Sequence, residues 1–195
     1  NLEINIGDKI GVEGKSGSGK STFLDILMGL LPIDSGKINV DGIELKDIKN
    51  NFQRQIGYVP QTVFLFDDSI KKNIAFGIPD EEIDNDKILK SIKLANLEEF
   101  CKNAKFGLNT KIGKNGSRLS GGQRQRIGIA RALYNNPKIL IFDEATVSLD
   151  DLTEKKIISD IFANFNDKTL IFVSHKKNNF AYCNKIINVE KYKIK

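Results

Sequence analysis

Nine residues near the start of the chain have the types and spacing of a phosphate-binding loop. Residues 14–22 read GKSGSGKST and fit the pattern G-x-x-x-x-G-K-[ST]. Its glycines carry no Cβ, so backbone N–H groups can close around a phosphate. Lys20 would bring a positive charge to the phosphates, and the Ser21 hydroxyl is a hard oxygen ligand suited to Mg²⁺. The sequence therefore predicts a nucleotide-triphosphate site made of Gly14, Lys15, Ser16, Gly17, Ser18, Gly19, Lys20, Ser21 and Thr22.

The elements around this loop decide between a phosphate site and a Gly/Ser-rich surface turn that happens to contain a lysine. Residues 10–12 in front of it are typical of a short buried strand, and residues 21–31 behind it have apolar side chains at helical spacing. This order would place a bound phosphate at a helix N-terminus, where backbone N–H groups and the helix dipole attract anions. The context therefore favours nucleotide binding.

Two acids follow an apolar strand predicted for residues 138–142. In a parallel sheet the carboxyl ends of the strands line the ligand crevice, so Asp143 and Glu144 would lie near the phosphate loop. Asp143 suits Mg²⁺, directly or through water, and Glu144 could polarise an attacking water. The alternative is an acidic pair that begins a turn after a core strand. The presence of the phosphate loop favours the catalytic interpretation.

The segment LSGGQ, residues 119–123, opens a helix predicted for residues 123–134. Ser120 suits the N-cap, and glycines at the start of a helix expose N–H groups to an anion. An ordinary helix cap is the alternative. A cap needs only one serine, however, and paired glycines lower helix propensity. The pair Gly121 and Gly122 therefore indicates that something approaches this backbone closely.

The remaining pattern predicts an α/β chain with a mostly parallel sheet buried on both faces. Helical periodicity without strands occupies residues 67–115, with helices expected at 69–75, 86–95 and 97–102. Asp41-Gly42 is a hairpin turn signal between two strands. The other strand-like segments are residues 2–6, 10–12, 37–40, 43–45, 56–59, 168–173 and 186–189.

Length and composition set broad limits. The 195 residues suit one domain, and 40% hydrophobic and 28% charged residues are typical of a folded rather than a disordered chain. No run of 18 apolar residues is present, so a membrane-spanning part would lie elsewhere. The chain opens within an apolar alternation, which suggests a piece of a longer polypeptide. Cys101 and Cys183 lack metal-binding spacing and are expected to be reduced thiols.

The sequence resembles a nucleotide-binding domain of the ATP-binding cassette (ABC) family over its whole length. The motifs occur in family order: the phosphate loop, Gln61 in YVPQ as the glutamine loop, the LSGGQ signature, the Walker B strand 139–144 with the loop 149–150 after it, and His175 in FVSH as the histidine switch. The resemblance implies ATP and Mg²⁺ as ligands. It implies metal binding by Ser21, Gln61 and Asp143, and contacts to the nucleotide from Ser120, Gly121, Gly122 and Gln123. Lys20, Gln61, Glu144 and His175 would serve hydrolysis, and His175 would sense the γ-phosphate. A purely structural histidine is the alternative for that residue.

For the fold, the resemblance implies a P-loop NTPase core with a mostly parallel sheet, an N-terminal antiparallel β part and an inserted helical subdomain. Residues 1–195 would form a single nucleotide-binding domain. Its ATP-binding core would comprise residues 1–66 and 116–195, and residues 67–115 would form the helical insertion. The signature helix, residues 120–135, would pack on that insertion.

Residues 68–77 are similar to the stretch that follows the glutamine loop in exporters. The resemblance thus implies the ATP-hydrolysing motor domain of an exporter or flippase, with lipids or lipid-linked saccharides as candidate cargo. Two such domains, here a homodimer, would sandwich two ATP molecules head to tail. They would work with a transmembrane domain, in the same or a partner chain, at the cytoplasmic face of the inner membrane.

The alternative function is a soluble ABC-type ATPase that acts on nucleic acid or the ribosome through a basic surface. The net charge is +5, but the lysines are scattered rather than massed in one run, and scattered charge is typical of a solvated face. We therefore expect no nucleic-acid partner.

The chain departs from the family pattern in three respects. Exporters read T-E-[VI]-G-E-x-G before the signature, whereas residues 110–116 read TKIGKNG, so Lys111 and Lys114 reverse the charge at both glutamate positions. Val147-Ser148 replaces the usual Ser-Ala before the loop 149–150. The family's aromatic platform for adenine lies further upstream than the thirteen residues that precede Gly14 here.

Overall fold

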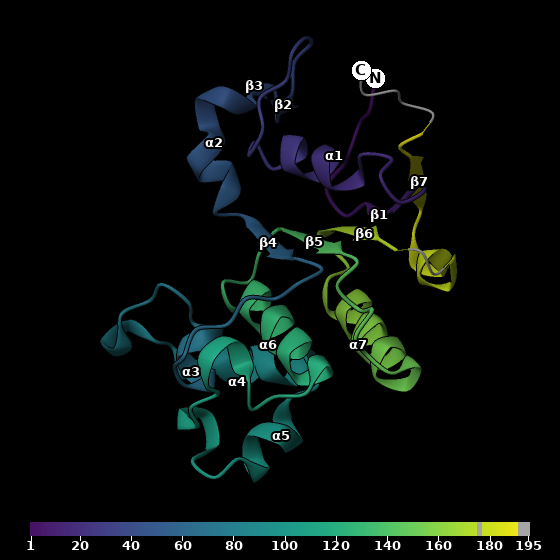
Figure 1. The fold of residues 1–195 in the computed structure, drawn as a ribbon. Coiled ribbons are helices and arrows are strands. Elements are labelled where there is room, and N and C mark those ends of the chain that lie inside the picture. The colour runs from purple at the N-terminus through teal and green to yellow at the C-terminus, as the bar shows by residue number, and fades with distance from the viewer. Residues whose placement is uncertain (175–176, 191–195) are drawn as a thin grey trace.

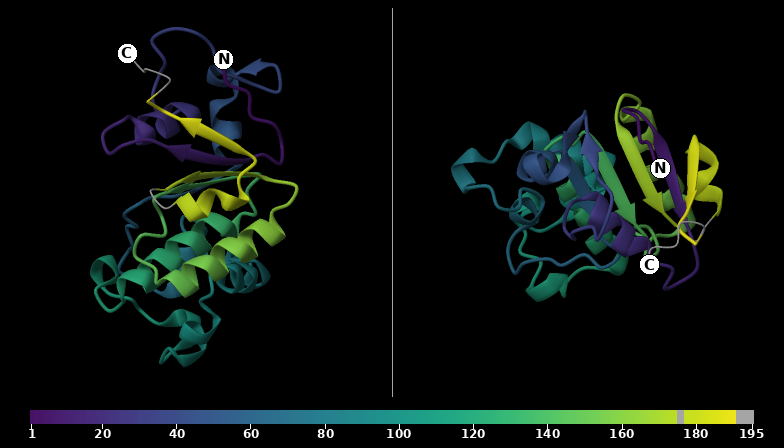
Figure 2. Two further views of the ribbon diagram at one scale, coloured as in Figure 1. Left: turned by 90° about the vertical axis from the view of Figure 1, so that its right-hand side faces the viewer. Right: turned by 90° about the horizontal axis from the view of Figure 1, so that it is seen from above.

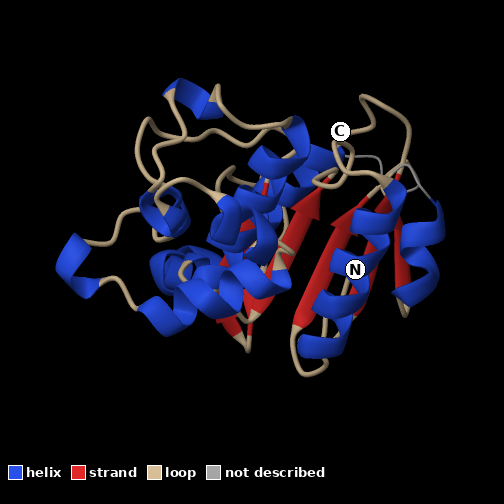
Figure 3. Ribbon diagram, turned by 90° about the horizontal axis from the view of Figure 1, so that it is seen from below, coloured by secondary structure: helices blue, strands red, loops and turns tan. Residues whose placement is uncertain are grey.

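A computed structural model describes residues 1–174 and 177–190 of the chain. Five parallel strands form its central sheet in the order β4-β5-β6-β1-β7 (Figure 1). Because the strands run in one direction, their carboxyl ends meet at one edge, where the arrowheads lie in Figure 3. The strands are β1 (Lys9–Glu13), β4 (Ile56–Val59), β5 (Ile139–Asp143), β6 (Thr169–Val173) and β7 (Lys185–Asn188).

The side chains of each central strand alternate between two hydrophobic cores, as the pleat of a β-strand requires. Ile141 of β5 faces the smaller core under helix α1 (Lys20–Leu27), whereas Leu140 and Phe142 face the larger core. Helix α2 (Leu45–Gln53) and the hairpin β2 (Asn39–Val40) and β3 (Ile43–Glu44) lie on the α1 side of the sheet (Figure 1). Figure 2 shows from a second direction that α1 and α7 cover opposite faces.

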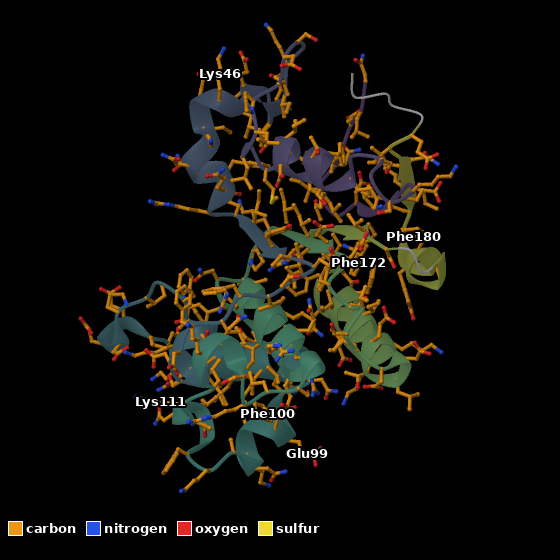
Figure 4. The ribbon with its side chains drawn as sticks, in the orientation of Figure 1. Lys46, Glu99, Phe100, Lys111, Phe172 and Phe180 are labelled. Atoms are coloured by element: carbon orange, nitrogen blue, oxygen red, sulfur yellow. The ribbon has the colours of Figure 1, made fainter. Side chains whose placement is uncertain are left out.

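Helices α6 (Gly121–Tyr134) and α7 (Asp151–Asn164) cover the other face. Phe172, labelled in Figure 4, stacks on Phe142 with ring centroids 4.6 Å apart and on Phe162 of α7 at 5.3 Å. A Cβ built on Gly57 of β4 would lie 2.5 Å from the carbonyl oxygen of Ala132. Glycine is thus required where α6 crosses the sheet edge.

A group of short helices packs on α6 away from the sheet. Ile70, Ile88 and Leu97 from this group share the larger core with Ile127 of α6. Among the described residues, no helix combines the length and the apolar composition needed to cross a membrane. The group comprises α3 (Ile70–Ile74), α4 (Asn85–Leu94), α5 (Glu98–Asn103) and the 3₁₀ turns η1 (Asp80–Glu82), η2 (Gly107–Asn109) and η3 (Lys114–Gly116). A further 3₁₀ element, η4 (Lys177–Tyr182), precedes β7, and its Phe180 (Figure 4) packs on β1.

Two local predictions were wrong, and one helix was missed. Residues 2–6 do not form a strand, because both edges of β1 are taken by β6 and β7. The segment turns instead, with the Asn5 N–H donating to Asp8 Oδ2 at 2.7 Å. The helix after the phosphate loop ends at Leu27 rather than Leu31, since Gly29 has a φ of +69°. Helix α2 was not predicted, because it buries only Leu45 and Phe52 in a polar segment. The other predicted strands and helices are confirmed, with shifted ends.

Candidate functional site

The phosphate loop joins the carboxyl end of β1 to the first turn of α1. Gly17 and Gly19 have φ angles of +77° and +93°, in the left-handed region that favours glycine. Within the described part of the chain, no hydrogen bond occupies the backbone N–H of either residue. Ser16 and Gly17 are exposed. The loop thus presents backbone donors to solvent at a helix N-terminus, the arrangement that binds an anion.

Lys20 and Ser18 point inward from this loop. The Lys20 side chain is only 7% exposed, and its ammonium donates to the carbonyl oxygens of Gly14 at 3.0 Å and Lys15 at 3.1 Å. The Ser18 hydroxyl is buried and has no hydrogen-bond partner among the described residues. Such a group destabilises the protein unless a ligand satisfies it. A Cβ on Gly14 would lie 2.4 Å from this hydroxyl, so a larger residue there would force the Ser18 side chain to move.

Asp143 ends β5 on the α1 side of the sheet. Its Oδ2 accepts hydrogen bonds from Ser21 Oγ at 3.3 Å and from the Tyr58 hydroxyl at 3.2 Å. Burial raises the pKa of Asp143, the two hydrogen bonds oppose that rise, and the nearby charges of Glu144 and Asp25 add to it. Two hard oxygen atoms, from Ser21 and Asp143, therefore lie together beside the phosphate loop.

Glu144 lies one residue beyond the strand and has a φ of +51°, which is uncommon for a residue other than glycine. Its N–H donates to the Val173 carbonyl at 3.1 Å. Its Oε1 lies 3.7 Å from the Lys20 ammonium, and its Oε2 accepts from Gln61 Nε2 at 3.0 Å. Adjacent acids thus have different partners, Asp143 with Ser21 and Glu144 with Lys20 and Gln61.

The structure brings together five of the residues singled out in the sequence, namely Lys20, Ser21, Gln61, Asp143 and Glu144. Among the described residues, no group of three or more His, Cys, Asp and Glu side chains could hold a metal by itself. The oxygens of Ser21 and Asp143 fit Mg²⁺, which is usually bound by one or two protein oxygens together with phosphates and water. His175 lies outside the described residues.

The signature residues form a helix cap. The Ser120 hydroxyl accepts from the Gln123 N–H at 3.2 Å, and Gln123 Oε1 accepts from the Ser120 N–H at 2.9 Å, so the predicted N-cap is confirmed. Gly121 and Gly122 lie against Ser148 and Leu149 of the loop before α7. In the described part of the chain, no hydrogen bond joins Ser120–Gln123 to residues 14–22.

Tyr58 was missed in the sequence, where it was interpreted only as part of the strand at residues 56–59. A polar hydroxyl in an apolar strand, three residues before Gln61, is the signal that could have identified it. The register of the sheet was also needed, because it places Tyr58 opposite Ile141, two residues before Asp143.

Comparison with known proteins identifies the family. Residues 1–147, well over half of the chain, match the model of the family described as ABC transporter. The chain belongs to the ABC transporter family. The fold of this ABC domain is the predicted α/β P-loop fold, which is therefore confirmed, and members of the family are ATPases.

Several full-length relatives resemble this ABC domain closely. An ATP-dependent lipid A-core flippase of Francisella novicida is 38% identical over 194 residues, which are 99% of this chain and 32% of the relative. The leukotoxin translocation ATP-binding protein LktB of Pasteurella haemolytica-like sp. (strain 5943B) is 42% identical over 195 residues, 100% of this chain and 27% of the relative. A solved bacterial Atm1-family ABC exporter with ATP bound has a TM-score of 0.89 at 34% identity, covering 96% of this chain and 32% of its own. The ABC domain thus spans about a third or less of the length of these relatives.

Proposed function

We propose that this ABC domain binds and hydrolyses ATP as the motor of an exporter or flippase. The observation that carries the proposal is the convergence of Lys20, Asp143 and Glu144 beside an open phosphate loop. The names of the relatives, a flippase, a translocation protein and an exporter, support a role in transport. These names favour transport over action on nucleic acid or the ribosome, because none of these three relatives is named for such an activity.

In this proposal, residues 14–22 bind the phosphates of ATP through backbone N–H groups, and Lys20 supplies the positive charge. Ser21, Asp143 and Gln61 would hold Mg²⁺, which when bound neutralises negative charge on the phosphates. The Glu144 carboxylate lies 3.7 Å from the Lys20 ammonium. It is therefore beside the position to which Lys20 would attract the terminal phosphate.

Glu144 is the proposed general base for hydrolysis. Its left-handed backbone turns the carboxylate out of the strand, and the hydrogen bond from Gln61 holds one of its oxygens. A carboxylate fixed in this way can orient a water and accept its proton. We propose His175 as the sensor of the γ-phosphate. We propose that Ser120, Gly121, Gly122 and Gln123 contact the nucleotide that is bound to a partner domain.

We propose that residues 1–66 and 116–195 form the ATP-binding core and that residues 67–115 form a helical insertion, within one domain of residues 1–195. Helices α3 and α4 pack on α6, as expected if the signature helix, residues 120–135, packs on the insertion. Arg131 of that helix donates to the Asn73 carbonyl at 2.7 Å and to the Phe64 carbonyl at 2.9 Å, which ties the insertion to the segment after Gln61.

An exposed aromatic patch where the core meets the insertion supports a membrane-domain partner. Phe64, Phe66 and Phe76 are 59%, 43% and 53% exposed. Phe66 and Phe76 stack with centroids 4.8 Å apart, and the Arg131 guanidinium lies 5.3 Å from the Phe76 centroid. Adjoining exposed aromatics mark interaction surfaces. We propose that a transmembrane domain, in the same or a partner chain, docks here and places this ABC domain at the cytoplasmic face of the inner membrane. A lipid or a lipid-linked saccharide is the proposed cargo.

We also propose that two copies of the ABC domain close head to tail around ATP. The signature glycines at the N-terminus of the 14-residue helix α6 offer donors that do not reach the chain's own phosphate loop. Val147 and Leu152, on either side of the loop that packs on these glycines, are 66% and 81% exposed. A homodimer would bury both apolar side chains and would bring each signature to the ATP bound by its partner.

Sedimentation tests this assembly. Glu144→Gln with ATP and Mg²⁺ should convert the domain from monomer to dimer, and ADP should not, because the signature donors find an acceptor only in a γ-phosphate. Partner and nucleotide then share one binding event, so dimerisation must depend on nucleotide by linkage. Adding Gly122→Asp should restore the monomer while ATP still binds, since it sets a carboxylate against the triphosphate.

The structure makes Gly122→Asp a selective change. A Cβ on Gly122 would lie 3.4 Å from the Ser148 oxygen and 3.6 Å from Leu149 Cδ2, which are ordinary contact distances, so the monomer should fold. Asn85→Asp, at the exposed first residue of α4, adds the same charge and should leave the dimer intact. A dimer that forms equally well without nucleotide, or that persists with Gly122→Asp, would show that the signature is only a helix cap.

A further inference from the structure

Tyr58 places a hydroxyl at the ATP site that the roles proposed above leave unused. Its ring packs against the core between the sheet and α1. Its hydroxyl donates to Asp143 Oδ2 at 3.2 Å, and the same oxygen accepts from Ser21 Oγ at 3.3 Å. Three elements, β4, β5 and α1, therefore meet at one carboxylate oxygen.

The register of the sheet explains how a tyrosine reaches this carboxylate. Tyr58 lies opposite Ile141 in the β4–β5 pair. Asp143 is two residues further along β5, so its side chain lies on the same face as that of Ile141, toward α1. A diagonal neighbour across two strands is within reach of an aromatic side chain. The length of tyrosine thus carries the hydroxyl to the end of the neighbouring strand.

The charges around Asp143 explain why a neutral donor is suited to this position. Burial raises the pKa of the carboxyl, and the charges of Glu144 and Asp25 act in the same direction. The Tyr58 phenol is an uncharged donor, and its hydroxyl lies 3.2 Å from Asp143 Oδ2. A lysine or arginine here would supply a hydrogen bond as well, but its positive charge would repel a metal ion.

We propose that Tyr58 is a positioning residue for Mg²⁺, an inference that rests on the ATP site proposed above. Its hydroxyl fixes the Asp143 carboxylate so that Oδ2 faces the Ser21 hydroxyl, and the two oxygens can then bind the metal without reorienting. Tyr58 acts through Asp143 and touches neither nucleotide nor metal. Loss of such an outer hydrogen bond to a metal ligand typically lowers metal affinity about 10–100-fold.

Tyr58→Phe removes the hydroxyl and keeps the packed ring. We expect the Mg²⁺ concentration that half-saturates nucleotide binding to rise about tenfold. A fluorescent ATP analogue, titrated with Mg²⁺ in the absence of turnover, gives this value. Affinity for the same analogue in EDTA should stay close to that of the wild-type chain. The matched control is Tyr134→Phe, which removes a hydroxyl bonded to the Asp84 N–H at 2.9 Å and should leave the Mg²⁺ requirement unchanged.

A second background tests whether the effect passes through Asp143. Asp143→Asn should itself raise the Mg²⁺ concentration that half-saturates nucleotide binding. Adding Tyr58→Phe to this variant should raise that concentration no further, because the effects of coupled residues are not additive. Tyr58→Met also lacks the hydroxyl and fills the space with a flexible apolar chain, so it replaces the Phe variant if that variant does not fold.

Three results would overturn the inference while leaving the ATP site in place. They are an unchanged Mg²⁺ requirement in Tyr58→Phe, an equal loss of affinity with and without Mg²⁺, and an undiminished effect in the Asp143→Asn background. A wild-type chain whose nucleotide binding does not respond to Mg²⁺ would overturn both this inference and the proposed function.

Discussion

Glu144→Gln is expected to lower the rate of ATP hydrolysis by on the order of 100-fold or more, the usual scale for removing a general base. That loss corresponds to about 2.7 kcal/mol in the activation free energy. The amide keeps the shape of the side chain, and its oxygen can still accept the hydrogen bond from Gln61. It cannot take a proton from water. ATP should therefore bind to the variant and remain intact. Phosphate release measures hydrolysis, and an equilibrium binding titration measures ATP affinity.

The matched control is Glu99→Gln, the same chemical change on the exposed surface of α5 (Figure 4). It should leave turnover unchanged. Hydrolysis by Glu144→Gln within about threefold of the wild-type rate, which is less than the smallest effect usual for a general base, would remove Glu144 from this role.

Lys20→Ala is expected to abolish tight ATP binding. The lysine is the cation at the centre of the loop, and a hydrogen bond to a charged group contributes about 1.5–3 kcal/mol. Its loss should weaken ATP affinity by at least about tenfold and up to more than 100-fold. Calorimetric titration with ATP and Mg²⁺ at moderate salt measures the change.

Two further variants separate charge from packing at this position. Lys20→Met fills the buried space left by the aliphatic stem, so it should lose ATP affinity as strongly as Lys20→Ala if the charge is what matters. Lys46→Ala removes a lysine far from the loop, exposed and paired with Glu44 (Figure 4), and should bind ATP normally. Equal ATP affinity in Lys20→Ala and the wild-type chain would exclude Lys20 from the site.

Much of the fold follows from local sequence patterns. Largely apolar segments such as residues 138–142 predicted strands buried on both faces, and the spacing of apolar residues predicted the helices that pack on them. The Asp41-Gly42 turn was also predicted, and both residues have positive φ. The strand prediction for residues 2–6 was wrong because alternation alone cannot show whether a sheet edge is free. Helix α2 was missed because its few apolar residues give only a weak pattern.

The candidate site was predictable as a set of residues but not as a set of contacts. The motifs named Lys20, Asp143 and Glu144, yet only the backbone of Glu144, with its φ of +51°, separates the partners of the two acids. Tyr58 could not be assigned from a motif, because its partner depends on the register of β4 against β5. The burial that shifts the pKa of Asp143 is likewise a property of the folded chain.

A single-turnover experiment tests most directly whether these residues form one hydrolytic site. ATP and Mg²⁺ are added to the chain at a concentration that permits dimerisation, and bound ATP, bound ADP and free phosphate are followed in one sample. The wild-type chain should convert its bound ATP, Glu144→Gln should retain ATP unhydrolysed, and Lys20→Ala should bind much less ATP than either. Hydrolysis by Glu144→Gln at the wild-type rate, or a wild-type dimer that holds ATP without cleaving it, would contradict the account.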